Sequence, residues 1–165
     1  MINILANDGI SQAGIDALTE KGFKVITKKV AQEDLINAIN KNNYEVLLVR
    51  SATTVRKGLI DACPHLKLVG RGGVGMDNID VEYAKEKGIN VINTPAASSS
   101  SVAELVFAHL FGMVRFLFDS NRQMPMVGDS DFKSLKKSYA NGRELSGKTL
   151  GIIGFGRIGQ EVAKR

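Results

Sequence analysis

The segment Gly154–Gly159 reads Gly-Phe-Gly-Arg-Ile-Gly and carries the strongest chemical signal in the sequence. It follows Leu150–Ile153, a short apolar run typical of a buried parallel strand, and it precedes Gln160–Arg165, which we expect to be helical. Strand, Gly-x-Gly-x-x-Gly and helix in this order predict a dinucleotide-binding turn. In such a turn the first glycine makes the bend, the second admits a pyrophosphate to the backbone, and the third lets helix pack on strand.

The start of the expected helix would supply the groups that hold a cofactor. Its free N–H groups and the helix dipole both favour phosphate oxygens. We therefore predict cofactor binding here in preference to a plain strand-to-helix turn. The acidic residue that contacts the adenosine ribose is expected about 20 residues further on, beyond Arg165. The sequence alone leaves NAD and NADP open.

A second Gly-x-Gly-x-x-Gly segment, Gly70–Gly75, also follows an apolar run. Its helix is expected to begin only near Asp80, so it fits the dinucleotide turn poorly. Consecutive N–H groups in a glycine loop can instead form an anion-binding nest. Arg50 and Ser51 end the preceding expected strand, so a guanidinium and these donors should face one crevice, suited to a carboxylate or to a carboxylate and a phosphate. An exposed arginine beside an ordinary turn is an equally compatible interpretation.

The other reactive side chains form no recognised catalytic constellation. We expect His65 to face solvent in a turn, and His109 to be a satisfied core or interface histidine of an apolar helix. Cys63, beside Pro64, is interpreted as packing. The sequence has no Walker loop, no nucleophile elbow and no metal-binding motif.

Composition restricts the classes of partner. The net charge of +5 is spread along the chain, and aromatic residues, at 6%, do not interleave with the cations, so we expect no nucleic-acid partner. A modest positive field suits a small anionic ligand. The first residues read as a strand without a leader pattern, which predicts a cytoplasmic protein. Val102–Phe118 is the most apolar stretch, but charged residues interrupt it, so we interpret it as a buried helix with no membrane partner.

Strand and helix patterns alternate through the first 95 residues, which predicts an α/β fold with a parallel sheet. The expected strands are Ile2–Ala6, Phe23–Thr27, Glu45–Val49, Leu66–Val69 and Ile89–Ile92. The expected helices are one capped by Ser11 and ended by Gly22, then Glu33–Lys41, Lys57–Ala62 and Asp80–Lys87.

A change of pattern at Thr94–Ser101 predicts a crossing between domains, so we divide the chain into residues 1–96 and 97–165. Ser101–Glu104 reads as a capping box that starts a long helix to about Asn121. The helix is apolar on nearly every side, so we expect it to be packed all round, between two domains or two subunits. Met124–Glu144 is expected to be irregular, with one helical turn near Phe132–Lys137. One strand and the start of one helix bury too little surface for a domain, so we expect further polypeptide to complete the second one.

Five ordered motifs together resemble the D-isomer-specific 2-hydroxyacid dehydrogenase family. They are Arg50–Thr53, Gly70–Asp80, Gly88–Pro95, Ser101–Leu105 and Leu145–Gly159. The resemblance implies a flavodoxin-like substrate domain followed by the start of a Rossmann NAD-binding domain, with the active site in the cleft. It also implies NAD as cofactor, a small anionic 2-hydroxy or 2-keto acid as substrate, and a homodimer or higher oligomer.

The resemblance implies hydride transfer between substrate and cofactor, with 3-phospho-D-glycerate of serine biosynthesis as the expected substrate. A relative acting on glyoxylate, hydroxypyruvate or D-lactate is the first alternative, and a dinucleotide-sensing module without catalysis is the second. Two sets of residues carry over. The cofactor set is Val74, Gly154, Gly156, Arg157, Ile158 and Gly159, and the substrate set is Arg50, Ser51, Gly72, Gly73, Val74 and, more weakly, Arg71.

The catalytic Arg, Glu and His of the family have no counterpart in these 165 residues. Glu104 and His109 do not occupy the matching positions, so we assign no catalytic residue. In the family the His is the acid–base group, the Glu tunes its pKa and the Arg holds the substrate oxygens. We expect a polypeptide of these 165 residues alone to be inactive.

Overall fold

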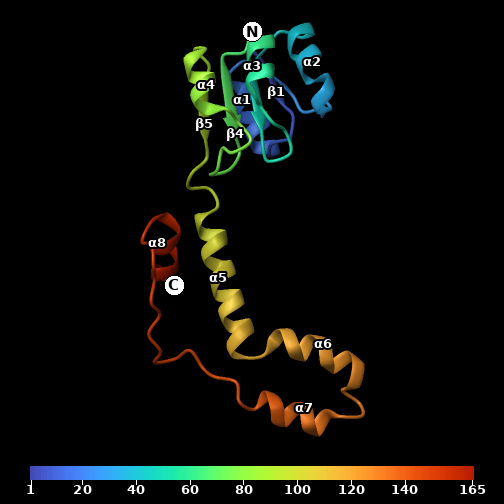
Figure 1. The fold of residues 1–165 in the computed structure, drawn as a ribbon, viewed down its shortest axis with the longest axis vertical. Coiled ribbons are helices and arrows are strands. Elements are labelled where there is room, and N and C mark those ends of the chain that lie inside the picture. The colour runs from blue at the N-terminus through green and yellow to red at the C-terminus, as the bar shows by residue number, and fades with distance from the viewer. The chain divides into compact units, whose positions relative to one another are not determined.

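The computed structural model describes residues 1–165 and divides into two compact units, Met1–Pro95 and Ala96–Arg165 (Figure 1). The first unit alternates strands and helices, whereas the second contains helices only.

The first unit is built around a five-stranded parallel sheet. Its strands are β1 (Asn3–Ala6), β2 (Lys24–Ile26), β3 (Tyr44–Val49), β4 (Leu68–Arg71) and β5 (Asn90–Asn93). Its helices are α1 (Gln12–Glu20), the 3₁₀ turn η1 (Gln32–Asp34), α2 (Leu35–Lys41), α3 (Lys57–Ala62) and α4 (Val81–Glu86). The strand order β2-β1-β3-β4-β5 is that of flavodoxin-like folds, so the predicted fold class is confirmed.

Apolar side chains from the strands and from α2 form the core of the first unit. Leu5, Leu47 and Val69 on three neighbouring strands are fully buried, as are Leu35 and Ile39 on α2. Strands covered on both faces need nearly continuous apolar runs, which is why these strands were recognisable. Cys63 joins this core, and burial raises the pKa of its thiol, as expected for a packing residue.

The boundaries of the first unit follow the predicted ones within about two residues. The Ser11 hydroxyl accepts a hydrogen bond from the Gly14 N–H (3.3 Å) and caps α1 as expected. The largest difference concerns β4, which begins at Leu68 rather than Leu66. Leu66 belongs to the preceding turn, because its N–H donates to the carbonyl of Cys63 (3.1 Å).

The second unit consists of α5 (Ser99–Val114), α6 (Leu117–Val127), α7 (Phe132–Tyr139) and α8 (Arg157–Lys164). The predicted capping box is wrong, because α5 begins two residues before Ser101 and no side chain caps it. The long helix is also broken: Phe116 takes a left-handed φ of 52° and separates α5 from α6. The expected irregular segment is largely helical, since α6 and α7 occupy much of it.

A further prediction about the second unit is wrong. Leu150–Ile153 forms no strand, because the unit offers no strand for it to pair with, and Ile153 is fully exposed. Within this single chain only Ser99 and Ala103 of α5 are buried, and Phe111 and Met113 are more than half exposed, so packing of α5 between domains or subunits stays a prediction. No single helix has the length and apolarity to cross a membrane; only the bent pair of α5 and α6, at 56°, meets both criteria together.

Candidate substrate and dinucleotide sites

The carboxyl ends of β1, β3 and β4 bring polar residues together at one edge of the sheet. The register pairs Ala6 with Leu48 and Val49 with Arg71, so the residues that follow β1 and β3 lie beside the end of β4. Open α/β sheets bind ligands at this edge. An open groove of about 350 Å³ lies there, and Asp8, Lys29, Arg50 and Ser51 are among the residues that line it.

Arg50 and Arg71 keep their charges available for a ligand. The Arg50 side chain is exposed and lies against Gly72, while the Arg71 guanidinium covers Gly73 so closely that a Cβ on that glycine would collide with it. Neither guanidinium pairs with a carboxylate, unlike those of Arg56 and Arg165. With Lys29 nearby, this edge carries an excess of positive charge that suits an anion.

The carboxylate of Asp8 is the one acid in the groove, and the neighbouring loop already occupies it. It accepts hydrogen bonds from the N–H of Arg50 (2.7 Å) and from the N–H (3.1 Å) and hydroxyl (2.8 Å) of Thr53. Burial by itself raises the pKa of Asp8, but these bonds and the charge of Lys29 outweigh burial and hold it below its ordinary value. Asp8 is therefore ionised and engaged, and it is poorly placed to act as a base.

The Gly70–Gly75 loop offers fewer free donors than the sequence suggested. The N–H of Gly72 donates to the carbonyl of Val49 (2.9 Å) and that of Gly73 to the carbonyl of Arg71 (3.0 Å). The N–H groups of Val74 and Gly75 have no acceptor within the chain, and the same is true of Ser51 and Ala52 on the adjacent loop. These four groups are the donors available to an anion, and the parts of Gly72 and Gly73 in binding stay predictions.

The Gly154–Gly159 loop has the local geometry of a dinucleotide turn. Gly154 has a φ of 93°, and a Cβ on Gly159 would collide with the Gly154 carbonyl oxygen, so both positions require glycine. The α8 helix begins at Arg157 with Gly156 as its N-cap, which is inside the glycine motif and three residues before the predicted start at Gln160. By contrast, the helix after the Gly70–Gly75 loop begins only at Val81.

The surface of the Gly154–Gly159 loop is open to a ligand. No atom lies within 4 Å of the position that a Cβ on Gly154 or Gly156 would take. The side chains of Arg157 and Ile158 are exposed, and the first N–H groups of α8 have no partner within the helix. These residues fit the diphosphate of a dinucleotide.

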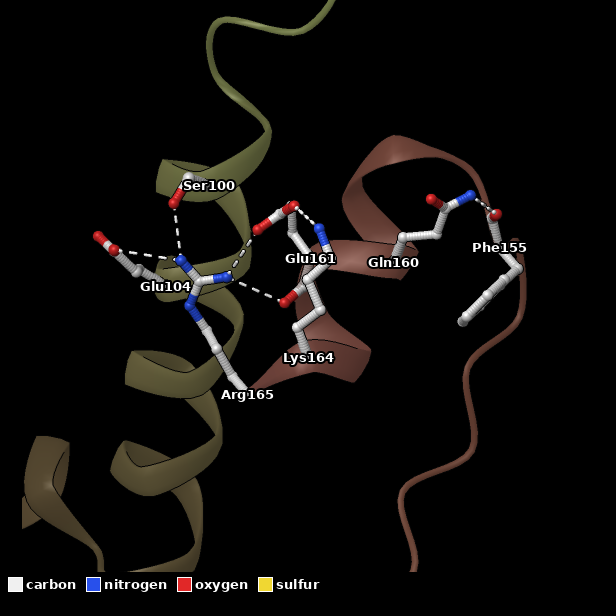
Figure 2. A network of polar contacts seen from close by, with 7 residues as sticks. All are labelled: Ser100, Glu104, Phe155, Gln160, Glu161, Lys164 and Arg165. Atoms are coloured by element: carbon white, nitrogen blue, oxygen red, sulfur yellow. Dashed lines mark hydrogen bonds and ion pairs between the residues drawn. The ribbon is translucent and has the colours of Figure 1, made fainter.

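The opposite end of α8 is anchored to α5, as Figure 2 shows. Arg165 donates to the hydroxyl of Ser100 (2.7 Å) and to the carbonyl of Glu161 (2.9 Å), and it pairs with the carboxylates of Glu104 (3.4 Å) and Glu161 (3.2 Å). Hydrogen bonds from Lys164 and Arg165 lower the pKa of Glu161. Glu104 therefore contributes a structural contact between α5 and α8.

The two histidines lie in different units. His65 is exposed in its turn, as predicted. His109 is exposed as well, and it lines a groove of about 580 Å³ between α5 and α6 instead of lying in a core.

Three comparisons identify relatives. The D-3-phosphoglycerate dehydrogenase of Methanocaldococcus jannaschii is 43% identical over 165 residues, which cover 100% of this chain and 30% of the relative. The hydroxypyruvate reductase of Thermotoga maritima is 43% identical over 160 residues, covering 96% of this chain and 50% of the relative. The solved structure of D-lactate dehydrogenase from Aquifex aeolicus, with NAD and lactic acid, has a TM-score of 0.64 at 30% identity and covers 99% of this chain and 47% of that one.

A family model assigns the chain directly. The model for the catalytic domain of D-isomer specific 2-hydroxyacid dehydrogenases matches residues 4–151, which is most of the sequence. The chain spans 30% of the first relative and about half of the other two proteins. The chain belongs to the D-isomer specific 2-hydroxyacid dehydrogenase family.

Proposed function

We propose that the polypeptide, at its natural length, oxidises 3-phospho-D-glycerate to 3-phosphohydroxypyruvate with NAD, the first step of serine biosynthesis. The observation that carries the proposal is the pair of arginines without carboxylate partners, Arg50 and Arg71, at the sheet edge of a family member. A substrate with both a carboxylate and a phosphate makes full use of two guanidiniums. The M. jannaschii relative, named for this activity, supports it.

The residues of this chain bind and orient the reactants. The free N–H groups of Val74 and Gly75 would donate hydrogen bonds to the substrate carboxylate, while Arg50 and Arg71 would hold the phosphate. The start of α8 would hold the cofactor diphosphate. When bound, the nicotinamide would accept the hydride that leaves C2 of the substrate.

None of the 165 residues fills the acid–base role. Asp8 is engaged by three hydrogen bonds, His65 is exposed outside the groove of the first unit, and His109 belongs to the second unit. We infer that further residues of the natural polypeptide take the hydroxyl proton and hold the carbonyl oxygen, so the 165 residues alone would bind without turnover. NAD is proposed over NADP on family resemblance, supported by the NAD-bound lactate dehydrogenase.

The deciding experiment is oxidation of NADH by the natural-length protein with 3-phosphohydroxypyruvate, compared with hydroxypyruvate and with NADPH. We expect fast turnover with NADH and a strong preference for the phosphorylated ketoacid. The Arg50→Ala variant should raise KM for the phosphorylated ketoacid about 10-fold or more and change KM for hydroxypyruvate much less, since only the former loses a charge-assisted contact. Equal effects on both ketoacids would rule out a phosphate role for Arg50. His65→Ala, in a distant turn, is the control.

A hydroxypyruvate or glyoxylate reductase is the second candidate. The T. maritima relative favours it, because its identity equals that of the phosphoglycerate dehydrogenase and the chain covers more of its length. Turnover of hydroxypyruvate without preference for the phosphorylated ketoacid would select this candidate. Binding of NADH without turnover of either ketoacid would contradict both.

A further inference from the structure

Two side chains hold the turn that carries Arg50. The carboxylate of Asp8 accepts hydrogen bonds from the N–H groups of Arg50 and Thr53, at 2.7 and 3.1 Å. The amide of Asn78 donates to the carbonyl oxygens of the same two residues, at 2.7 and 2.6 Å. All four backbone polar groups at the ends of the Arg50–Thr53 turn are therefore bound by side chains from outside it. The N–H groups of Ser51 and Ala52, between them, remain free for a ligand.

Asn78 is itself fixed in place. Its side chain is buried, with 6% of the residue exposed. The backbone around it forms an isolated parallel bridge in which the Val55 N–H donates to the Asn78 carbonyl (2.9 Å) and the Asp80 N–H donates to the Val55 carbonyl (3.0 Å). An exposed ion pair between Arg56 and Asp80 (3.0 Å) also joins these two segments. The backbone that carries the Asn78 amide is therefore fixed.

The same amide also contacts the second arginine. Its Oδ1 accepts a hydrogen bond from Nε of Arg71 (3.3 Å), while its Nδ2 holds the Arg50 turn. Only an amide can donate to two carbonyls and accept from a guanidinium at once. An aspartate of the same shape would place negative charge against the carbonyl oxygens of Arg50 and Thr53.

We propose that Asn78 is a positioning residue that fixes the Arg50 turn and the Arg71 guanidinium in one arrangement, and so sets the selectivity of the groove for a substrate with two anionic groups. This inference rests on the proposed function for its substrate. Asn78 touches no substrate in this assignment and acts through the two arginines. Asp8 completes the clamp from the side of β1.

The first test compares Asn78→Asp and Asn78→Ala with the wild-type natural-length protein by steady-state kinetics. We expect KM for 3-phosphohydroxypyruvate to rise about 10-fold or more with kcat changed less than about 3-fold, because binding geometry is lost while the chemical step is intact. The Kd for NADH should stay unchanged, which separates this effect from misfolding. The control is Asn40→Ala. It also removes a hydrogen bond donated by a side-chain amide, in this case to the carbonyl of Ala62 (2.8 Å).

A double-mutant cycle tests whether Asn78 acts through Arg50. In the Asn78→Asp background, Arg50→Ala should raise KM clearly less than it does in wild type, because the positioning is already lost. Additive effects on KM, or an Asn78 variant with wild-type KM for the phosphorylated ketoacid, would overturn the proposal.

A second measurement tests, independently of catalysis, whether Asn78 holds the Arg50–Thr53 turn. Hydrogen–deuterium exchange of the peptide that spans residues 50–55 should accelerate about 10-fold or more in Asn78→Ala and stay at the wild-type rate in Asn40→Ala. Unchanged exchange in Asn78→Ala would overturn the clamp even if KM rose. If the wild type reduced neither ketoacid, the proposed function would fail, yet faster exchange would still support the clamp.

Discussion

At the scale of single residues, the groove separates charges that serve the fold from charges that remain for a ligand. The carboxylate of Asp8 accepts three hydrogen bonds from the Arg50–Thr53 turn. Arg50 and Arg71 form no ion pair with a carboxylate. A buried acid that neutralised either guanidinium would remove the attraction for an anionic substrate. The site therefore depends on Asp8 being saturated by neutral donors.

The engaged carboxylate predicts a specific pH dependence of stability. The pKa of Asp8 is lower in the folded protein than its ordinary value, so its stabilising contribution is complete above about pH 4 and is lost as pH falls through the folded value. Asp8→Asn should lower the free energy of unfolding by about 2 kcal/mol at pH 7. This difference should shrink as pH falls below about 4, because the unfolded chain then binds a proton at Asp8 that the folded protein does not.

Urea denaturation at several pH values would measure this difference. Asn40→Ala is the control, since it removes a hydrogen bond without removing a titrating group, and its cost should not vary with pH. A difference between wild type and Asp8→Asn that stayed constant down to pH 3 would contradict the role of the carboxylate.

Local patterns explain which parts of the site were predictable. Arg50 and the Gly70–Gly75 loop follow apolar strands, so short segments placed them at the sheet edge. For the Gly154–Gly159 loop the glycine spacing alone was a valid guide, because no strand precedes it. Asp8 and Asn78 were missed because their partners lie 42 to 45 and 25 to 28 residues away in sequence, where no periodicity reports a contact. The one local hint was Asn7-Asp8 directly after a buried strand, where open sheets place ligand-binding residues.

At the scale of secondary-structure elements, a helix start is identified by what the hydroxyl contacts and not by residue type alone. Ser11 caps α1 because its side chain reaches the Gly14 N–H. Ser101 has the stronger sequence signal, with Glu104 three residues later, but it lies inside α5, where its hydroxyl caps nothing. A capping box in sequence shows only that a cap is possible. The break between α5 and α6 was missed in a similar way. The apolar pattern continues past Phe116, and periodicity does not show that this residue is left-handed.

The two serines form a matched test of where these helices begin. Ser11→Ala should lower the free energy of unfolding by about 1 kcal/mol, because the Gly14 N–H loses its side-chain acceptor and keeps only the carbonyl of Ser11 (3.0 Å). Ser101→Ala should change it by about 0.5 kcal/mol or less, with a slight gain expected from the helix propensity of alanine. Chemical denaturation of both variants would measure these changes. A larger loss in Ser101→Ala than in Ser11→Ala would place the start of α5 at the capping box after all.

At the scale of the whole molecule, the apolar residues of the second unit are not matched by burial of their side chains. The second unit exposes large apolar side chains that a folded protein usually covers. On α5 and α6 they are Leu105, Val106, Phe111, Met113, Leu117 and Phe118. The apolar pattern predicted a helix packed between two domains or two subunits, and hydropathy does not show which of these covers it.

We propose that a second copy of the chain covers this surface, as family resemblance implies. Met113, Leu117 and Phe118 line one groove between α5 and α6, so they offer a continuous apolar contact. Met113→Asp should raise the dissociation constant of a dimer about 100-fold or more, because association would bury an unpaired carboxylate. Sedimentation equilibrium of the natural-length protein would measure this change, with His65→Asp, in an exposed turn of the first unit, as the control. A monomeric wild type would show instead that the same polypeptide covers the groove, and equal dissociation constants for wild type and Met113→Asp would place the dimer interface elsewhere.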